Sequence, residues 1–454
     1  MKICVLGCGL RTPLLLHGLI HSGLRIQETA LYDIDISRAT DMAQLGQHLA
    51  LDSTMTVRAE STLEAAIAGS SFVISSIRVG NMERRALDEA LALECGFTGQ
   101  ETTGPAGFAM ALRTIPVSLS HARLVERLAP SAWYINFTNP AGIITQAVSS
   151  HTGVRVIGIC DTPTQLIFDI SRVLGEAPVD VHCEYFGLNH LGWIRSVRVK
   201  GEEILPRLMS DDNLLQHLYP ASLFPPPLIR ALGMIPAEYL FFYYNHVLAR
   251  DNQKRTGATR GAELDSLNRQ VIAQLEEHIR GGAPEKALHE YRLYLNRRNG
   301  SYLRLEADAH SAFEQPPDAE WDPFQGETGY HRIAVDTLRA LSSPSPHSLI
   351  LNVANRGSIE GLADQDIVEV RCMVDRAGPR PLAVGKLPRS VEGLVLSMKQ
   401  SERLTIKAAM EQDWDSAVLA LTTNPLVGDW NAAGNFMERL RRSDPLHFSG
   451  FERS

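Results

Sequence analysis

The stretch that decides the fold is Lys2-Ile-Cys-Val-Leu6 together with the turn that follows it, Gly7-Cys-Gly-Leu-Arg-Thr-Pro13. A continuous apolar run of this kind is typical of a central strand in a parallel sheet, because such a strand is buried on both faces. The segment from Leu14 to Ile20 is apolar and is predicted to form a helix. Strand, glycine turn and helix together indicate the first unit of an α/β fold.

The glycine turn also has features of a dinucleotide-binding site. Gly7 and Gly9 would let backbone amides approach a pyrophosphate at the N-terminus of the helix, although Thr12 lies where the usual fingerprint has its third glycine. A second predicted strand, 29–33, ends at Asp33, where a carboxylate would hold the hydroxyl groups of the adenosine ribose. We therefore predict NAD binding, with NAD favoured over NADP, and a purely structural turn is the alternative.

Strands and helices continue to alternate through the N-terminal half, which predicts a Rossmann-type doubly wound parallel sheet. Residues 1–195 are expected to form this NAD-binding domain. Residues 196–454 are expected to form a mainly helical α+β domain with a small antiparallel sheet, used for substrate binding and oligomerisation. In this second part we expect helices at 202–218, 236–250, 261–280, 391–411 and 413–421, and a strand of the small sheet at 366–374.

Composition limits the class of protein. The 454 residues carry 44 Lys and Arg against 52 Asp and Glu, a net charge of −8, without a basic block, so binding to nucleic acid or to an anionic membrane is not expected. The six cysteines are scattered, which predicts reduced thiols and a cytoplasmic location. A strand predicted from Lys2 argues against a signal peptide. The sequence also contains no apolar run of about 18 residues, the length that would be needed to span a membrane.

Polar side chains follow several of the predicted strands. Cys160 and Asp161 end the strand at 154–159, and they are either a metal ligand beside an acid or a buried thiol followed by a helix cap. Asn136 and Asn139 follow the strand that begins at 132, where they would contact a cofactor or sugar, or else form local turns.

Two further segments are rich in polar groups. Residues 99–107 form a glycine-rich stretch without helical or strand periodicity, which is predicted to be a ligand-binding loop. Arg85 lies in a charged helical segment that is either solvated or in contact with an anionic sugar substituent. The stretch 315–329 is predicted to be a polar lid or insertion.

Five ordered motifs resemble one known family, and the similarity extends from Met1 to about Pro425. They resemble the NAD- and metal-dependent glycosidases of glycoside hydrolase family 4, above all their 6-phospho-β-glucosidase branch. The motifs are Gly99-Gln-Glu-Thr-Thr-Gly104, Asn136-Phe-Thr-Asn-Pro140, Gly158-Ile-Cys-Asp-Thr-Pro163, Tyr185-Phe-Gly-Leu-Asn-His190 and Asn355-Arg-Gly-Ser-Ile-Glu360.

The resemblance implies an unusual route to hydrolysis. NAD⁺ takes a hydride from C3 of the sugar, a base removes the acidified proton on C2, and the aglycone leaves from C1 by elimination. Water then adds and NADH returns the hydride, so the net reaction is hydrolysis. A divalent metal, Mn²⁺ in this family, would polarise the C2 and C3 oxygens. Trp321 and Phe324, in the stretch 315–329, would cover the aglycone.

The resemblance also implies roles for individual residues. Cys160 and His190 match the two metal ligands, and Tyr239 matches the base that removes the C2 proton. Asp161 matches a catalytic acid of the α-glycosidase branch, where β-enzymes often carry Asn, so the anomer is left open. The residues assigned to NAD are Gly7, Gly9, Thr12, Asp33, Arg78 and Asn136, and those assigned to the substrate are Arg85, Glu101, Asn139, Asn189 and Arg260.

The chain departs from the family pattern where a 6-phosphate would bind. The first loop is one residue shorter than the family's Ser-Tyr-Thr-Pro form, Leu10 replaces its serine, and Ala86 and Leu87 are apolar at two polar positions. A non-phosphorylated or carboxylated sugar is therefore an alternative substrate. Family members form dimers or tetramers, and we expect a homodimer or homotetramer. Two other functions are weighed: an NAD-dependent dehydrogenase of a hydroxy acid or sugar acid, and an NAD- or sugar-binding regulator.

Overall fold

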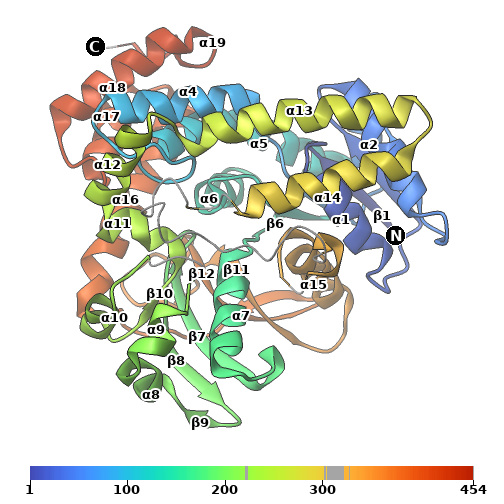
Figure 1. Ribbon diagram of the computed structural model, residues 1–454. Coiled ribbons are helices and arrows are strands. Elements are labelled where there is room, and N and C mark those ends of the chain that lie inside the picture. Colours follow the sequence, from blue (N-terminus) through green and yellow to red (C-terminus); the bar gives the residue numbers. More distant parts are fainter. Residues whose placement is uncertain (220–222, 301–302, 304–321, 327, 453–454) are drawn as a thin grey trace.

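The computed structural model describes residues 1–219, 223–300, 303, 322–326 and 328–452. Within these residues, nine strands form one sheet in the order β13-β12-β11-β6-β5-β4-β1-β2-β3 (Figure 1). The strands are β1 (Lys2–Leu6), β2 (Glu28–Tyr32), β3 (Thr56–Ala59), β4 (Phe72–Ser75), β5 (Trp133–Asn136), β6 (Arg155–Gly158), β11 (His347–Ala354), β12 (Ile367–Asp375) and β13 (Gly378–Pro381).

The first six strands confirm the predicted Rossmann topology. Strands β3-β2-β1-β4-β5-β6 are all parallel, and the strand order reverses between β1 and β4, which is where such sheets bind ligands. Strands β11, β12 and β13 then extend the sheet in antiparallel fashion beyond β6. The expectation that 366–374 belongs to a separate small sheet is therefore wrong, because β12 pairs with β11 of the main sheet.

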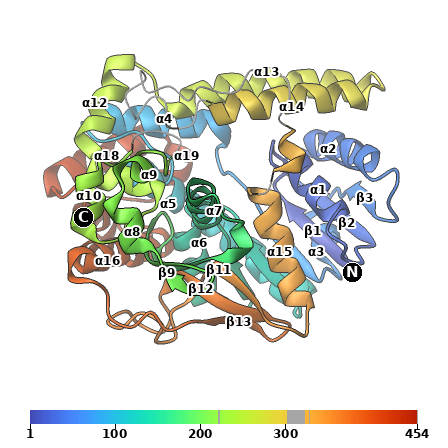
Figure 2. The same ribbon diagram turned by 60° about the horizontal axis from the view of Figure 1, so that its bottom comes forward.

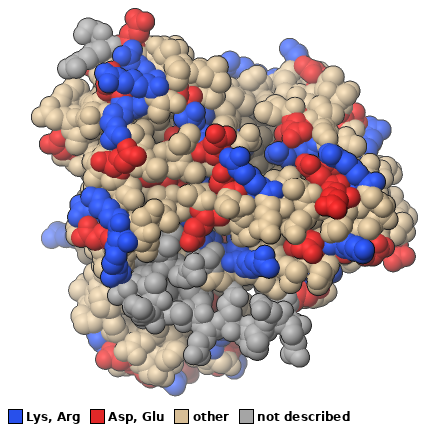
Figure 3. All heavy atoms as spheres, turned by 45° about the horizontal axis from the view of Figure 1, so that its top comes forward, with Lys and Arg blue, Asp and Glu red and all other residues tan. Residues whose placement is uncertain are grey.

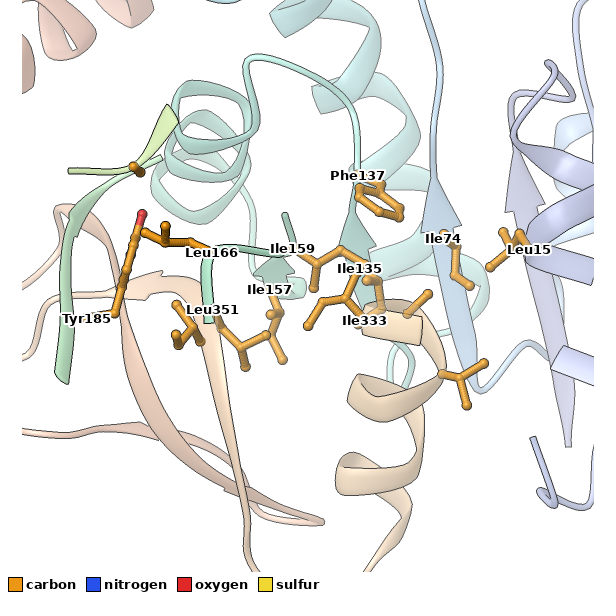
Figure 4. Close-up of a cluster of buried hydrophobic side chains, with 14 of the residues drawn as sticks. Leu15, Ile74, Ile135, Phe137, Ile157, Ile159, Leu166, Tyr185, Ile333 and Leu351 are labelled. Atoms are coloured by element: carbon orange, nitrogen blue, oxygen red, sulfur yellow. The ribbon is translucent and has the colours of Figure 1, made fainter. Parts of the chain in front are cut away.

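Apolar side chains on alternate positions bury both faces of the sheet, as the uniformly apolar strands require. On one face Ile74, Ile135 and Ile157 join Leu15 and Ile333, which lie on the helices α1 (Thr12–Ile20) and α15 (Tyr330–Ser342). Figure 4 shows this row of side chains continuing to Leu351 of β11 and Tyr185. The opposite face packs against other helices, chiefly α5 (Gly104–Leu128), α6 (Ala141–His151), α16 (Arg389–Glu411) and α17 (Trp414–Thr423).

The predicted small antiparallel sheet is present beside the main one. Among the described residues it consists of β7 (Val181–Leu188), β8 (Leu191–Val199), β9 (Glu202–Glu203) and β10 (Ile235–Pro236). Two short helices, α8 (Leu205–Ser210) and α10 (Pro226–Leu232), lie against it, and α9 (Asp212–Gln216) packs on both of them (Figure 2). The single helix expected at 202–218 is thus a strand followed by two short helices.

A pair of long helices lies side by side on the outside of the molecule. Helix α13 (Arg260–Arg280) packs against both α4 (Asn81–Glu94) and α14 (Pro284–Gly300), and Figures 1 and 2 show α13 and α14 along the top of both views. The remaining helices are α2 (Ile36–Leu49), α3 (Leu63–Ile67), α7 (Thr162–Leu174), α11 (Phe241–Tyr244), α12 (His246–Thr256), α18 (Trp430–Ser443) and α19 (Pro445–Phe448).

Two predicted boundaries are wrong. The stretch 99–107 is a loop only to Thr103, because Gly104 begins α5, a buried helix with a proline in its first turn. The helix expected at 236–250 is interrupted: Pro236 belongs to β10, a 3₁₀ turn spans Glu238–Leu240, and α11 and α12 follow. Tyr239 lies in that turn, so tertiary contacts rather than helical periodicity fix its position.

The surface agrees with the composition. Figure 3 shows acidic and basic side chains interspersed on the face it presents, rather than gathered in a patch of one sign. None of the helices in the described ranges is long and apolar enough to cross a membrane. Partly exposed apolar residues on α16, α17 and α18 include Leu396, Leu419 and Trp430. Subunit assembly through these helices stays a prediction.

Candidate active site

A row of residues paired in register crosses the sheet at the carboxyl ends of β5 and β6. Asn136 on β5 is paired in register with Gly158 on β6, Gly158 with Asn352 on β11, and Asn352 with Glu369 on β12. Gly158 has no room for a side chain, since a Cβ would lie 2.4 Å from the Thr145 hydroxyl oxygen and 2.8 Å from the Asn352 Cβ. A glycine is therefore required at this position, two residues before Cys160.

Most of the predicted catalytic, metal and substrate residues meet in one cavity of about 380 Å³ at these strand ends. They come from separate parts of the fold: the turn after β6, the hairpin between β7 and β8, the 3₁₀ turn, helix α4, and the N-terminus of α13. The cavity is lined by Arg85, Glu101, Asn139, Cys160, Asp161, His190, Tyr239 and Arg260, among other residues.

Cys160 and His190 lie next to each other in the wall of the cavity. The Cys160 Sγ atom lies 3.5 Å from His190 Nε2. His190 lies in the two-residue turn between β7 and β8 with φ 61°, a left-handed conformation that is unfavourable for a residue with a Cβ. The Tyr239 ring stacks on the imidazole with centroids 3.8 Å apart and planes 1° apart, which fixes its orientation. Strain at this turn is offset by contacts that hold the imidazole.

Burial controls the protonation of this pair. It lowers the pKa of His190 to about 4, so the imidazole is neutral near pH 7, as a metal ligand must be. Burial, together with the carboxylates of Glu369 and Asp161, raises the pKa of the Cys160 thiol well above its usual value. A coordinated cation reverses that effect, because it deprotonates a ligating thiol outright.

Asp161 is at the N-terminus of α7 but does not cap it. Its side chain makes no capping hydrogen bond, so the interpretation of Asp161 as a helix cap is wrong. Instead the carboxyl lines the cavity beside Cys160. Burial raises its pKa, and the guanidinium group of Arg11 opposes that shift.

A buried ion-pair network lies on the other side of the cavity. Glu101 accepts from Arg78 Nη2 at 2.8 Å and from Arg85 Nη1 at 2.7 Å, and Arg85 Nε also donates to Glu89 at 2.8 Å. Burial acts to raise the pKa of Glu101, but Arg85 and Arg78 outweigh it and hold that pKa well below its usual range. The Arg85 side chain is 8% exposed, which excludes the alternative of a solvated helix face.

The network continues to helix α13. Glu89 Oε2 accepts the backbone N–H of Gly261 at 2.6 Å, next to Arg260, whose Nη2 donates to the carbonyl oxygen of Arg298 at 2.8 Å. Arg260 is therefore held at the cavity by both α4 and α14. Asn189 does not line the cavity, because its amide donates to Glu369 Oε1 at 3.0 Å.

A second cavity of about 390 Å³ adjoins the first, and Arg11, Asn139 and Tyr330 line both. It reaches Gly9 and Arg78 at the point where the strand order reverses. Gly7 has φ 91°, and a Cβ there would lie 2.7 Å from the Ser76 carbonyl oxygen after β4, so a glycine is required.

The remaining residues assigned to NAD lie differently. Asp33 accepts the N–H of Cys8 at 2.7 Å and thereby ties the end of β2 to the glycine turn. Thr12 is buried in the first turn of α1 and lines neither cavity. For Asn136 the local-turn alternative holds: its Oδ1 accepts the N–H of Thr138, and its Nδ2 donates to the Thr145 hydroxyl at 3.1 Å. The predicted contact of Asn136 with the cofactor is therefore wrong.

Only part of the predicted lid, 315–329, falls within the described residues. Trp321 lies outside the described residues. Phe324 is 3% exposed and packs against Tyr291 and His17 rather than lining either cavity, so its expected contact with an aglycone is wrong. Neighbouring residues, among them Thr328 and Tyr330, line the first cavity instead.

Three residues of the site were missed in the sequence. Arg11 projects into both cavities from the glycine turn, with its guanidinium 3.6 Å from the Tyr330 ring centroid. Glu369 is a fully buried carboxylate that accepts hydrogen bonds from Tyr185, Asn189 and Asn352. The sequence could have indicated this residue, because a Glu between two valines of a buried strand is unusual. The Thr102 hydroxyl oxygen lies 2.9 Å from His190 Nδ1, and no local sequence pattern predicts this contact.

Two family models match the chain. The model for family 4 glycosyl hydrolases matches residues 2–176, and that for the family 4 glycosyl hydrolase C-terminal domain matches residues 185–427. A probable 6-phospho-β-glucosidase of Bacillus subtilis (strain 168) is 28% identical over 465 residues, covering 99% of this chain and 98% of the relative.

The structure of the 6-phospho-β-glucosidase from Thermotoga maritima with manganese, NAD⁺ and glucose-6-phosphate is 28% identical. It superposes with a TM-score of 0.80 over 98% of this chain and 99% of the other. A lactate dehydrogenase from a deep-sea metagenome library is 14% identical, with a TM-score of 0.51 over 90% of this chain and 98% of the other, a likeness of fold alone.

Proposed function

This chain belongs to the family 4 glycosyl hydrolases, and on that premise we propose that it hydrolyses 6-phosphorylated glucosides with the help of NAD⁺ and a divalent cation, Mn²⁺ by preference. The observation that supports the proposal best is the meeting of Cys160, His190 and Tyr239 in one cavity, next to a second cavity at the glycine turn. An NAD-dependent dehydrogenase or a binding protein would also need a cavity for its ligand, but it would not need Cys160, His190 and Tyr239 together in that cavity.

The second cavity has the features that a dinucleotide requires. The approach of Gly7 to Ser76 leaves no space for a Cβ, and the glycine turn leads directly into the N-terminus of α1, where backbone N–H groups can bind an anion. Asp33 ends β2 close to the turn, where a ribose would be held. Residues from α13 and α14, including Tyr294 and Asn268, close the opposite side of this cavity.

The first cavity suits a cation that the substrate helps to bind. The described residues contain no group of three or more His, Cys, Asp or Glu that could hold a metal ion. Cys160 and His190 supply one sulfur and one neutral nitrogen, so sugar oxygens and water would complete the coordination. A site of this kind fits a metal that acts on the sugar during the reaction rather than one that stabilises the fold.

The bound NAD⁺ and cation would supply oxidation at sugar C3 and Lewis-acid stabilisation of the charge that develops on the sugar oxygens. Tyr239 is then placed to take the C2 proton, since its ring is fixed against His190 at the cavity wall. Asp161, on the cavity wall beside Cys160, is placed to donate a proton to the departing oxygen. After the aglycone leaves, water adds at C1 and gives a proton to the Asp161 carboxylate, while Tyr239 returns its proton to C2.

A negatively charged substrate fits the arginines of the cavity. Arg78 and Arg85 are already paired with Glu101 and Glu89. The Arg11 guanidinium forms no hydrogen bond or ion pair with any described residue and lies over the rings of Tyr330 and Phe137, 3.6 Å and 5.9 Å from their centroids. A guanidinium held in this way would bind a phosphate with two parallel hydrogen bonds. Arg11 would thus take over from the serine that the family has in this loop and that Leu10 replaces.

The test compares aryl glucosides of both anomers, with and without a 6-phosphate, in the presence of NAD⁺ and Mn²⁺. We expect aglycone release from a 6-phosphorylated substrate without steady NADH accumulation, loss of activity on adding a chelator, and slower turnover of a 2-deuterated substrate. Activity that survives removal of both NAD⁺ and metal would refute the proposal. Net NADH formation would instead indicate a dehydrogenase, and the anomer that is cleaved would decide between the α- and β-branches.

A further inference from the structure

We propose that Thr102, oriented by Gln100, is a positioning residue that holds His190 in the one neutral tautomer whose Nε2 lone pair faces Cys160 and can bind the cation. The inference rests on the metal-binding role given to His190 in the proposed function. The observations that support it are the hydrogen bonds of the loop 99–103.

The side-chain amide of Gln100 is oriented without ambiguity. Its Oε1 atom lies 2.7 Å from the backbone nitrogen of Thr102 and 2.8 Å from that of Thr103. Both backbone groups are obligate donors, so the atom they share must be the oxygen rather than the nitrogen of the amide. Gln100 is 8% exposed, and the loop therefore wraps around a buried acceptor.

This acceptor decides where the Thr102 hydroxyl hydrogen points. Thr102 Oγ1 lies 3.0 Å from Gln100 Oε1 and 2.9 Å from His190 Nδ1, and it has one hydrogen to share between them. Two oxygens 3.0 Å apart attract only when a hydrogen lies between them, and Gln100 Oε1 cannot provide it. The hydroxyl therefore donates to Gln100 and accepts from His190, so the imidazole proton is on Nδ1.

The consequence appears on the other side of the ring. With the proton on Nδ1, Nε2 presents its lone pair to the Cys160 Sγ atom 3.5 Å away. With the opposite tautomer, an N–H would point at that position and no cation could bind there. Ligating histidines generally need such a partner at the second nitrogen to fix both tautomer and ring direction. Here a neutral threonine serves, and Tyr239 stacking blocks rotation of the ring.

The chain supplies a matched control for testing this role. Thr103 Oγ1 also donates to Gln100 Oε1, at 3.1 Å, but no hydrogen bond joins it to His190 among the described residues. Thr102→Val removes the acceptor for Nδ1 while keeping the shape of the side chain, and Thr103→Val removes an equivalent loop hydrogen bond. Thr102→Ser keeps the hydroxyl and serves as the conservative replacement.

The first measurement is Mn²⁺ binding to the protein in the presence of NAD⁺. The electron paramagnetic resonance signal of the free ion reports how much Mn²⁺ stays unbound. We expect Thr102→Val to weaken Mn²⁺ binding by roughly 10- to 100-fold, with Thr102→Ser and Thr103→Val close to wild type. Equal weakening in both valine variants would assign the effect to the loop as a whole and overturn the proposal. Unchanged binding in Thr102→Val would also overturn it.

The second measurement needs no metal and no substitution of Thr102. In protein labelled with ¹⁵N-histidine, long-range ¹H–¹⁵N correlation distinguishes the two tautomers, and a His190→Gln variant assigns the signal. We expect wild-type His190 to carry its proton on Nδ1. A proton on Nε2 would refute the proposed role of Thr102 even if the Thr102→Val variant folds poorly. If wild-type protein binds no Mn²⁺, the proposed function fails, while this spectrum still decides the tautomer.

Discussion

Replacing Tyr239 with Phe isolates the chemistry proposed for this residue from its structural role. The Tyr239 ring stacks on His190 at 3.8 Å and 1°, and Phe keeps that ring while removing only the phenolic oxygen. An aromatic pair of this kind contributes about 0.5–1.5 kcal/mol beyond its buried area, and Tyr239→Phe retains this contribution. We therefore expect the free energy of unfolding and Mn²⁺ affinity to stay near wild type.

Activity should change far more. General base catalysis contributes roughly 100- to 10,000-fold, so kcat should fall by that factor, equivalent to about 2.7–5.5 kcal/mol at 1.36 kcal/mol per tenfold. The assay is release of the aglycone from an aryl 6-phosphoglucoside, together with exchange of the C2 hydrogen for solvent deuterium. Loss of both at unchanged stability would identify the oxygen of Tyr239 as the proton acceptor.

Tyr243 provides the control. It is a tyrosine in the same segment, and its hydroxyl donates to the Met398 sulfur at 3.7 Å, away from the cavity lining. Tyr243→Phe should leave kcat and C2 exchange within about twofold of wild type, because the hydroxyl it removes faces only a weak acceptor. C2 exchange that persists in Tyr239→Phe, or is lost equally in Tyr243→Phe, would refute the assignment of the base.

Three other predictions follow from the charged groups. In Arg11→Gln, the preference in kcat/KM for the phosphorylated over the unphosphorylated substrate should fall by roughly 10- to 150-fold, because a hydrogen bond to a charged group contributes about 1.5–3 kcal/mol. The affinity for NAD⁺, measured by fluorescence, should not change. A variant that loses only NAD⁺ affinity would contradict this prediction. Arg113→Met leaves Asp88 and Asp444 buried without the guanidinium that binds both, so urea unfolding should show a loss of about 3–5 kcal/mol. Burial lowers the pKa of His121 to about 4 against about 6.5 in an unfolded chain, so the unfolded state binds more protons between these values and stability falls as the pH is lowered through them. His121→Gln should flatten that part of the stability profile, and an unchanged slope would count against it.

The sequence allowed the sheet and its binding edge to be predicted because both depend on short local patterns. Uniformly apolar runs identify parallel strands, and the glycine turn after β1 identifies the end at which ligands bind. The motifs of the family placed Cys160, His190 and Tyr239 together, and the structure brings all three to one cavity. Their chemical roles stay proposals.

Tertiary structure decided what local patterns could not contain. Strand β12 alternates like a member of any sheet, and only its pairing with β11 attaches it to the main one. Asn136 could serve a cofactor or a turn, and the proximity of Thr145 settles it in favour of the turn.

The same reason applies to His190. The sequence by itself identified His190 as the last residue of the motif 185–190, because that motif is local. That its ring is held by a threonine 88 residues away and by Tyr239 was decided only by the packing of separate elements against each other. Such contacts follow from the folded sheet and not from the periodicity of any one segment.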